Sequence, residues 1–177
     1  MSDWLGRIVC GDNVEVLSGF PAECVDLVVT SPPYDDLRIY GGHSWNFEAL
    51  AAQLVRVLKP GGVIVWVVND ATKDGSETGT SMRQALGFMA LGLRLHDTMI
   101  YDKGKCVWPD PTRYGQTWEY MFVLSKGAPK TVNKLKDRVN AFGGTKSFGV
   151  QTERMKDGTL KRRNQIEVAE VGHRLNI

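Results

Sequence analysis

The stretch Val25-Asp26-Leu27-Val28-Val29-Thr30-Ser31-Pro32-Pro33-Tyr34 decides the fold. Its first six residues are mostly β-branched or apolar, which predicts a buried strand. The two prolines cannot continue a central strand, because they donate no backbone hydrogen bond and their φ angle is fixed. We therefore expect the strand to end at Thr30 and the chain to turn at Ser31–Tyr34, at the carboxyl end of a sheet strand.

The residues around this stretch predict alternating helices and strands, which is typical of a sheet covered by helices. Apolar residues recur at helical spacing from Phe47 to Leu58, and the breakers in Lys59–Gly62 end that helix. Val63–Val68 is apolar throughout, as expected of a strand covered on both faces. The other predicted elements are an Arg7–Cys10 strand, a short helix capped by Asn13, a Thr72–Thr80 loop, a helix capped by Ser81 and followed by Gly92, and strands at Leu93–Tyr101 and Trp118–Leu124.

The composition is that of one folded domain: the chain has 177 residues, of which 42% are hydrophobic and 24% charged. This apolar fraction excludes a disordered or fibrous chain. No apolar run reaches the roughly 20 residues that cross a bilayer, and the first residues lack the form of a secretory signal. We therefore expect a cytoplasmic protein without a membrane partner. The three cysteines lack CxxC spacing and the three histidines are isolated, so we expect neither a disulfide framework nor a metal site.

Charge is distributed unevenly along the chain, although the formal net charge is only +2. Lys126–Arg163 holds 11 basic and three acidic residues, a net charge of +8, which leaves −6 for the rest. Such a segment attracts phosphate backbones through counterion release. The alternative is a solvated surface loop. The basic residues that we single out as phosphate contacts are Lys130, Lys134, Lys136, Arg138, Lys146, Arg162 and Arg163.

The Ser31–Tyr34 turn has the chemistry to hold a flat heteroaromatic amine. Prolines lack amide hydrogens, so the carbonyls of Pro32 and Pro33 project from a stiff turn as acceptors. Ser31 adds a hydroxyl that donates or accepts, and Tyr34 adds a flat ring with a polar tip. Ligands of open α/β sheets bind outside the carboxyl ends of the strands. The alternative is a rigid turn whose tyrosine only packs against the core.

Four blocks in order resemble the amino-methylating DNA methyltransferases, which modify cytosine N4 or adenine N6, in their beta arrangement with the catalytic region first. The blocks are Gly11-Asp12, the Val25–Tyr34 stretch, Leu58-Lys59-Pro60-Gly61-Gly62 and Trp118-Glu119-Tyr120-Met121-Phe122-Val123-Leu124-Ser125-Lys126-Gly127. The similarity covers about residues 8–127. It implies an α/β fold, the Rossmann-like fold of S-adenosyl-methionine-dependent methyltransferases, with a mostly parallel sheet and one antiparallel strand pair.

The resemblance also implies a role for the turn. Ser31, Pro32, Pro33 and Tyr34 correspond to the catalytic tetrapeptide of the family. Serine at its first position is more usual in the cytosine-N4 members, so we favour cytosine over adenine. S-adenosyl-methionine would be the cofactor and double-stranded DNA the substrate, with the target base flipped out. The expected activity is that of a site-specific methyltransferase of bacterial, archaeal or phage restriction-modification; methylation of RNA or of a protein amide is an alternative.

Three polar residues are candidate cofactor contacts, because each follows a predicted strand. Asp12 follows the Arg7–Cys10 strand, and a helix-capping role is the alternative. Asn69 and Asp70 follow the Val63–Val68 strand, and solvation of the strand end is the alternative. The sequence alone leaves these alternatives open.

The last part of the sequence departs from the family pattern. Members of this order carry an Asp-Pro-Phe-x-Gly-Ser-Gly loop after the recognition segment, and the 177 residues contain none. We predict a catalytic region at 1–127, a DNA-contacting target-recognition segment at 128–165 and a return to the core at 166–177. A truncated enzyme, a chain complemented by a second copy or another polypeptide, and a non-catalytic DNA-binding half all fit this pattern. The sheet would then have one flank without a neighbouring strand.

Overall fold

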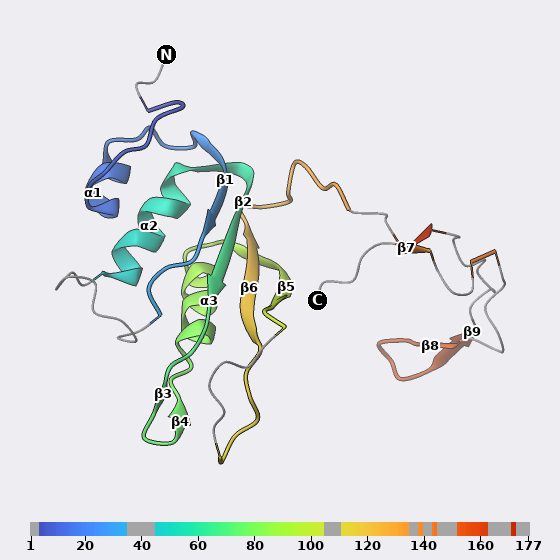
Figure 1. Ribbon diagram of the computed structural model, residues 1–177. Helices are drawn as coiled ribbons and strands as arrows, with labels where there is room; N and C mark the ends of the chain where they lie inside the picture. Colours follow the sequence, from blue (N-terminus) through green and yellow to red (C-terminus); the bar gives the residue numbers. More distant parts are fainter. Residues whose placement is uncertain are drawn as a thin grey trace. The chain divides into compact units, whose positions relative to one another are not determined.

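The computed structural model describes residues 4–34, 45–104, 111–134, 138–139, 143–144, 152–162 and 171–172 (Figure 1). The chain forms two compact units, of which the first ends at Thr131 and the second begins at Val132. The first unit contains α1 (Asn13–Ser18), β1 (Val25–Thr30), α2 (Phe47–Val57), β2 (Leu58–Val68), β3 (Thr72–Lys73), β4 (Ser76–Glu77), α3 (Thr80–Ala90), β5 (Arg94–Asp102) and β6 (Trp118–Ser125). The second contains β7 (Arg138–Val139), β8 (Thr152–Arg154), β9 (Leu160–Arg162) and β10 (Val171–Gly172).

The first unit is built on a four-stranded sheet in the order β1-β2-β6-β5. Strand β1 runs parallel to β2, whereas β6 runs antiparallel to both β2 and β5. The predicted antiparallel pair is therefore confirmed, and within the described strands the sheet is mixed, with one parallel pairing and two antiparallel ones. Strand β1 lies at the edge, and its carboxyl end leads directly into the Ser31–Tyr34 turn.

The core lies between one face of this sheet and the helices α2 and α3. Ile64 pairs with Leu124 and Trp66 with Phe122 across β2 and β6, and all four side chains are buried. They join one cluster with apolar residues of the two helices, among them Leu54 and Phe88. Trp66 lies at its centre: its ring centroid is 5.0 Å from that of Phe88. Its indole nitrogen donates to Gln84 Oε1 at 2.8 Å.

The opposite face of the sheet is not covered by any described helix. Along β2, Ile64, Trp66 and Val68 are buried, whereas Val63, Val65 and Val67 are only partly buried. The prediction that this strand is covered on both faces is therefore wrong for the described part of the chain. The residues of Val63–Val68 are apolar on both faces of the sheet, but α2 and α3 both pack against the same face.

Several predicted element limits also change. Strand β2 begins at Leu58, directly after α2, because Leu58 already pairs with Val25 of β1. Arg7–Cys10 is not a strand: it has no partner strand among the described residues, and Ile8 is fully exposed. The predicted Thr72–Thr80 loop contains the β3–β4 hairpin. Gly92, with φ +94°, follows the end of α3 as predicted.

Two glycines and a lysine hold the junction between α2 and β2. A Cβ on Gly62 would lie 2.9 Å from Leu58 Cδ1 and 3.0 Å from the Asp26 carbonyl oxygen, so only glycine fits there. Gly61 has φ +80°, which favours glycine. Lys126 Nζ donates to the carbonyl oxygens of Val55 and Leu58, at 3.1 Å and 3.0 Å. This lysine of the basic segment is thus engaged inside the first unit.

The described residues of the second unit form short two-stranded sheets, β7 with β10 and β8 with β9. Of the segment predicted as a return to the core at 166–177, only residues 171–172 are among the described residues. In the ranges that the structure describes, no helix has the length and apolar character needed to cross a bilayer.

Candidate active site

The Ser31–Tyr34 turn leaves the sheet edge as the prolines require. Pro32 is buried, Pro33 and Tyr34 are half-buried, and Ser31 is exposed. One part of the Tyr34 ring packs against the core cluster. The alternative of a tyrosine that only fills the core is too simple, because its hydroxyl also makes two polar contacts.

These contacts form a relay of hydrogen bonds from the turn to β6. Tyr34 Oη donates to Glu119 Oε2 at 2.9 Å and lies 2.7 Å from Ser31 Oγ. The other carboxylate oxygen of Glu119 forms an ion pair with Lys103 Nζ at 3.0 Å. An ionised carboxylate only accepts hydrogen bonds, so the proton of Tyr34 points to Glu119. The phenol oxygen then accepts the proton of Ser31.

The direction of this relay defines what the exposed serine can do. Because the Ser31 hydrogen points to Tyr34, the lone pairs of Ser31 Oγ are left to accept a hydrogen bond from an incoming N–H group. The neighbouring proline carbonyls are further acceptors on the same turn. The turn can therefore hold an amine through its two hydrogens. Since each donor in the relay is already fixed, the acceptor geometry does not have to reorganise when the amine arrives.

Sequence reasoning missed the roles of Glu119 and Lys103. Glu119 stands in an otherwise apolar strand that the family resemblance includes, and no role follows from that resemblance. A charged residue inside such a strand is rarely buried without a partner, and its side chain is only 15% exposed. A lone carboxylate in such a strand could have identified Glu119 as a residue that needs a partner. Which residues are its partners could not be predicted, because they lie in segments distant in sequence.

Asn69 and Asp70 lie at the carboxyl end of β2, as predicted, and both bond within the protein. Asp70 accepts from Ser81 N at 2.9 Å and from Ser81 Oγ at 2.6 Å. Asn69 Oδ1 accepts from Gln116 Nε2 at 3.0 Å. Ser81 was predicted to cap α3, but the helix begins at Thr80 after Gly79, which makes no side-chain cap. The carboxylate of Asp70 provides this function, so the Ser81 prediction is wrong.

Replacing Asp70 by alanine is expected to lower the free energy of unfolding by about 1–3 kcal/mol, because the Ser81 amide and hydroxyl lose their acceptor. Urea denaturation followed by circular dichroism measures this change. The control is Asp26→Ala, which removes an exposed carboxylate paired with Lys59 and should cost no more than about 1 kcal/mol. Equal effects of the two substitutions would contradict the capping role.

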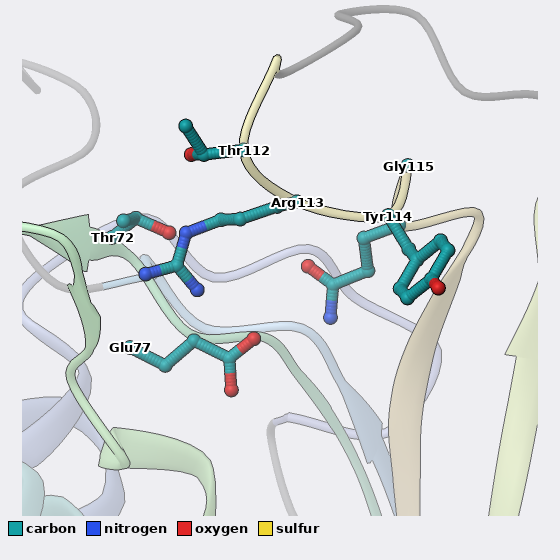
Figure 2. A pocket seen from close by; sticks show the side chains of 7 residues that line it. Thr72, Glu77, Thr112, Arg113, Tyr114 and Gly115 are labelled. Carbon is teal, nitrogen blue, oxygen red and sulfur yellow. The ribbon is translucent and has the colours of Figure 1, made fainter.

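A pocket of about 500 Å³ lies beside this end of β2 and is lined by Thr72, Glu77 and Thr112–Gln116 (Figure 2). Gln116 joins it to Asn69. Arg113 donates to the carbonyl oxygen of Gly75, and the Tyr114 ring is fully exposed. In Figure 2 the Arg113 guanidinium points toward Thr72 and Glu77, whereas the Tyr114 ring lies apart from it. An exposed ring can stack on a base and a guanidinium can contact a phosphate.

Tyr120 of β6 lies within electrostatic range of two carboxylates, one of which, Glu77, lines this pocket. Burial, and then the carboxylates of Asp70 and Glu77, raise the pKa of Tyr120 above its ordinary value. Among the residues that the structure describes, no three His, Cys, Asp or Glu side chains come together as a metal site.

Asp12 lies at the start of α1 and acts as its N-cap. Its Oδ1 accepts from Val14 N at 2.9 Å and from Glu15 N at 3.0 Å. The prediction that Asn13 caps this helix is wrong, because Asn13 is its first residue. The capping alternative for Asp12 is what the structure shows, and its cofactor contact stays a prediction.

The predicted phosphate contacts are spread over both units. Lys130 belongs to the first unit and Lys134 and Arg162 to the second, and all three are exposed. Arg162 lies on β9, paired with Thr152 of β8. The backbone of Arg138 forms part of β7. Lys136, Lys146 and Arg163 lie outside the described residues. A contact of any of these residues with phosphate stays a prediction.

Comparison with known proteins identifies the family. A model of the DNA methylase family N6_N4_Mtase matches residues 25–167. The chain belongs to this family. It is 53% identical over 154 residues to the orphan methyltransferase M.BamHII of Bacillus amyloliquefaciens, an alignment that covers 86% of this chain and 58% of that protein. The resemblance to the beta-arranged amino-methyltransferases is thereby confirmed.

Solved structures confirm the fold of this DNA methylase family member. The Thermus thermophilus protein TTHA0409, solved with S-adenosyl-L-methionine, is 25% identical with a TM-score of 0.53, over 71% of this chain and 56% of that chain. PvuII DNA methyltransferase, described as cytosine-N4-specific, is 23% identical with a TM-score of 0.54, over 68% of this chain and 49% of that chain. The fold is thus the α/β fold of S-adenosyl-methionine-dependent methyltransferases. The chain spans about half to three fifths of the length of these proteins.

Proposed function

We propose that this chain is the catalytic part of a site-specific DNA methyltransferase that methylates an exocyclic amine, with cytosine N4 as the target. The observation that carries the proposal is the relay from Glu119 through Tyr34 to Ser31, at the carboxyl end of β1. It presents Ser31 as an acceptor beside the proline carbonyls in a member of the DNA methylase family. Serine as the first residue of the turn supports cytosine over adenine.

The chemical problem is that the lone pair of an exocyclic amine is delocalised into its ring. Hydrogen bonds from the two N–H groups to Ser31 Oγ and to the Pro32 carbonyl favour a pyramidal nitrogen, and the lone pair then becomes available. The turn therefore acts mainly by positioning and by the placement of acceptors. Neither role requires a covalent intermediate with the protein.

S-adenosyl-methionine supplies an electrophilic methyl group when it is bound. Asp12 fits a contact with such a cofactor, since in the described part of the chain only its Oδ1 is engaged and its side chain is exposed. Asn69 and Asp70 fit less well, because their side-chain oxygens hold Gln116 and Ser81. These two residues then support the shape of the site, and Asp12 is the stronger cofactor candidate.

Double-stranded DNA is the proposed substrate, and the target base has to leave the duplex to reach the turn. The half-buried Tyr34 ring is the proposed surface on which the flipped base stacks. Exposed basic residues of the second unit, Lys134 and Arg162 among them, supply phosphate contacts. The β8–β9 hairpin is a two-stranded ribbon, a shape that the major groove admits.

The test is methyl transfer from labelled S-adenosyl-methionine to duplex DNA by the full-length protein. Hydrolysis of the DNA and mass spectrometry of the nucleosides then identify the product. Detection of N4-methylcytosine supports the proposal. Detection of N6-methyladenine contradicts cytosine as the target base but still supports an amino-methyltransferase. Salt-sensitive DNA binding without any methyl transfer would contradict the proposed enzymatic activity and favour a non-catalytic DNA-binding half.

Charge removal in the second unit is expected to weaken DNA binding uniformly across sequences. Each of Lys134→Gln and Arg162→Gln should lower the slope of log K against log salt by about 1, because one counterion fewer is released. Fluorescence anisotropy with duplexes of different sequence between about 50 and 200 mM salt measures the slope. Unchanged slopes would show that these exposed residues only contact solvent. Lys59→Gln serves as the control, because Lys59 is paired with Asp26 in the first unit.

A further inference from the structure

Two loops at one end of the sheet border the pocket of about 500 Å³. One is the β3–β4 hairpin, which follows β2, and the other is the 111–117 segment, which leads into β6. In Figure 1 both extend beyond the same end of the sheet. This is the end at which β1 leads into the Ser31–Tyr34 turn, because β1 runs parallel to β2. No residue of that described turn lines the pocket, so the pocket is a second cavity at the same edge.

A cation and a carboxylate share this pocket. Arg113 is partly buried, and its guanidinium donates to the carbonyl oxygen of Gly75 in the hairpin. In Figure 2 it points toward Glu77, which is exposed. Within the described residues the two groups form no ion pair with each other. The bond to Gly75 uses one of the five N–H donors of the guanidinium. Arg113 is thus held in place and still offers donors beside the acceptor oxygens of Glu77.

This combination favours a ligand that presents acceptors and a donor side by side. A phosphate matches Arg113 but is repelled by the Glu77 carboxylate, so a phosphate alone fits the pocket poorly. The edge of a guanine–cytosine pair in the major groove presents both kinds of group, because guanine O6 and N7 accept and cytosine N4 donates. Arginine commonly binds guanine O6 and N7, and glutamate accepts from cytosine N4. One base pair can therefore engage both side chains.

The pocket also lies close to the Ser31–Tyr34 turn along the chain. Gln116 lines the pocket, and Glu119, three residues later, accepts from the Tyr34 hydroxyl. Three extended residues span at most about 10 Å, and about three base pairs occupy the same length of a duplex. A duplex whose flipped base lies at the turn therefore places a base pair about three positions away, or fewer, at the pocket.

We propose that the pocket between the β3–β4 hairpin and the 111–117 segment reads a guanine–cytosine pair near the target base, with Arg113 on the guanine and Glu77 on cytosine N4. Neither residue belongs to the basic Lys126–Arg163 segment, so the first unit takes part in reading the sequence. The inference rests on the proposed DNA substrate and assigns a sequence feature to it.

The experiment selects the duplexes that the full 177-residue chain binds from a pool of randomised sequence, without cofactor, and sequences them. The unaltered chain should enrich a guanine–cytosine pair at one position. Arg113→Gln and Glu77→Gln should each lower the preference for guanine–cytosine over adenine–thymine at that position by about tenfold, the loss of one contact to a base. The preferences at the other positions should stay unchanged, and circular dichroism checks that both variants are folded.

The matched controls are Asp74→Asn and Arg94→Gln, which should leave every preference unchanged. Asp74 is an exposed carboxylate of the same hairpin that does not line the pocket, and asparagine tolerates its φ of +49°. Arg94 is an exposed arginine at the start of β5, where it pairs with Ser125 at the opposite end of the sheet.

Three results would overturn the proposal. The first is a uniform loss of affinity in Arg113→Gln and Glu77→Gln with unchanged preferences, because it would show that both residues only hold the loops. The second is a preference for adenine–thymine at the position that the two substitutions affect. The third is an unaltered chain that selects no sequence.

The selection needs no methyl transfer, so its outcome is separate from that of the proposed function. A preference that Arg113→Gln and Glu77→Gln relax, in a chain that transfers no methyl group, contradicts the proposed activity alone. Methyl transfer by a chain whose two variants keep the guanine–cytosine preference contradicts this inference alone.

Discussion

Methyl transfer to duplex DNA is expected to fall by about 10²–10³-fold when Ser31 is replaced by alanine, since loss of one preorganised hydrogen bond to a reacting group has this effect. Ser31 is exposed, and its hydroxyl contacts Tyr34 at 2.7 Å. Removing the Ser31 hydroxyl leaves the proline carbonyl oxygens as acceptors, but they hold only one of the two hydrogens of the amine. The loss should appear in kcat, with the KM for DNA little changed, because the contact strengthens as the nitrogen becomes pyramidal.

The relay behind Ser31 predicts graded effects at Glu119. Glu119→Ala removes the acceptor that orders the Tyr34 hydroxyl, and kcat should fall by about 10-fold or more, within the range of positioning effects. Glu119→Gln keeps a carbonyl acceptor for Tyr34 but loses the Lys103 ion pair, so it should recover part of the rate. If Glu119 only stabilised the fold, the rate of methyl transfer by each variant would instead follow the fraction of the protein that is folded.

The matched control is Glu23→Gln, which removes a different carboxylate–lysine pair, that of Glu23 with Lys126 at 3.2 Å. It should leave kcat unchanged, because neither residue contacts the turn. Equal rates for Ser31→Ala and the unaltered enzyme would refute the role of the turn. A Glu119→Ala enzyme with full kcat would refute the relay while leaving the turn in place.

The parts of the fold that follow from local sequence were predictable. Strand β1 ends at Thr30 as expected, because the two prolines that follow cannot extend a ladder. Helix α2 begins at Phe47, after Asn46, whose side chain accepts from Ala49 N at 2.9 Å. Each of these limits depends on residues within a few positions of the element end. The chemistry of Ser31–Tyr34 could be predicted from the sequence as well, because the turn is one continuous stretch of residues.

The parts that depend on distant contacts were not predictable. Arg7–Cys10 has a strand composition, but a strand exists only with a neighbour, and composition does not reveal whether one is present. Ser81 matches the pattern of a cap, yet Asp70 from another segment supplies the carboxylate. Glu119 is 85 positions from Tyr34 in the chain. Pairings at such separation are fixed by the sheet order and cannot be read from spacing.

Replacing Trp66 by alanine is expected to have the largest effect on stability, a loss of about 3–5 kcal/mol from removal of a buried aromatic side chain. Trp66 is fully buried and contacts Phe88, Phe47 and Trp45. Its removal also leaves Gln84 Oε1 without its indole donor in a buried position, which adds about 1–3 kcal/mol. Since small domains are stable by only about 5–15 kcal/mol, much of the molecule should be unfolded at about 37 °C.

Urea denaturation separates this core effect from damage to the active site. Trp66→Ala should lower the midpoint with little change in m, and Trp66→Phe should recover part of the packing while Gln84 still lacks its donor. Leu86→Ala, at an exposed position of α3, should change stability by less than about 0.5 kcal/mol. A Trp66→Ala protein with the stability of Leu86→Ala would mean that α2 and α3 do not depend on this side chain. The covered face of the sheet would then not be the core that positions β1 and the turn that follows it.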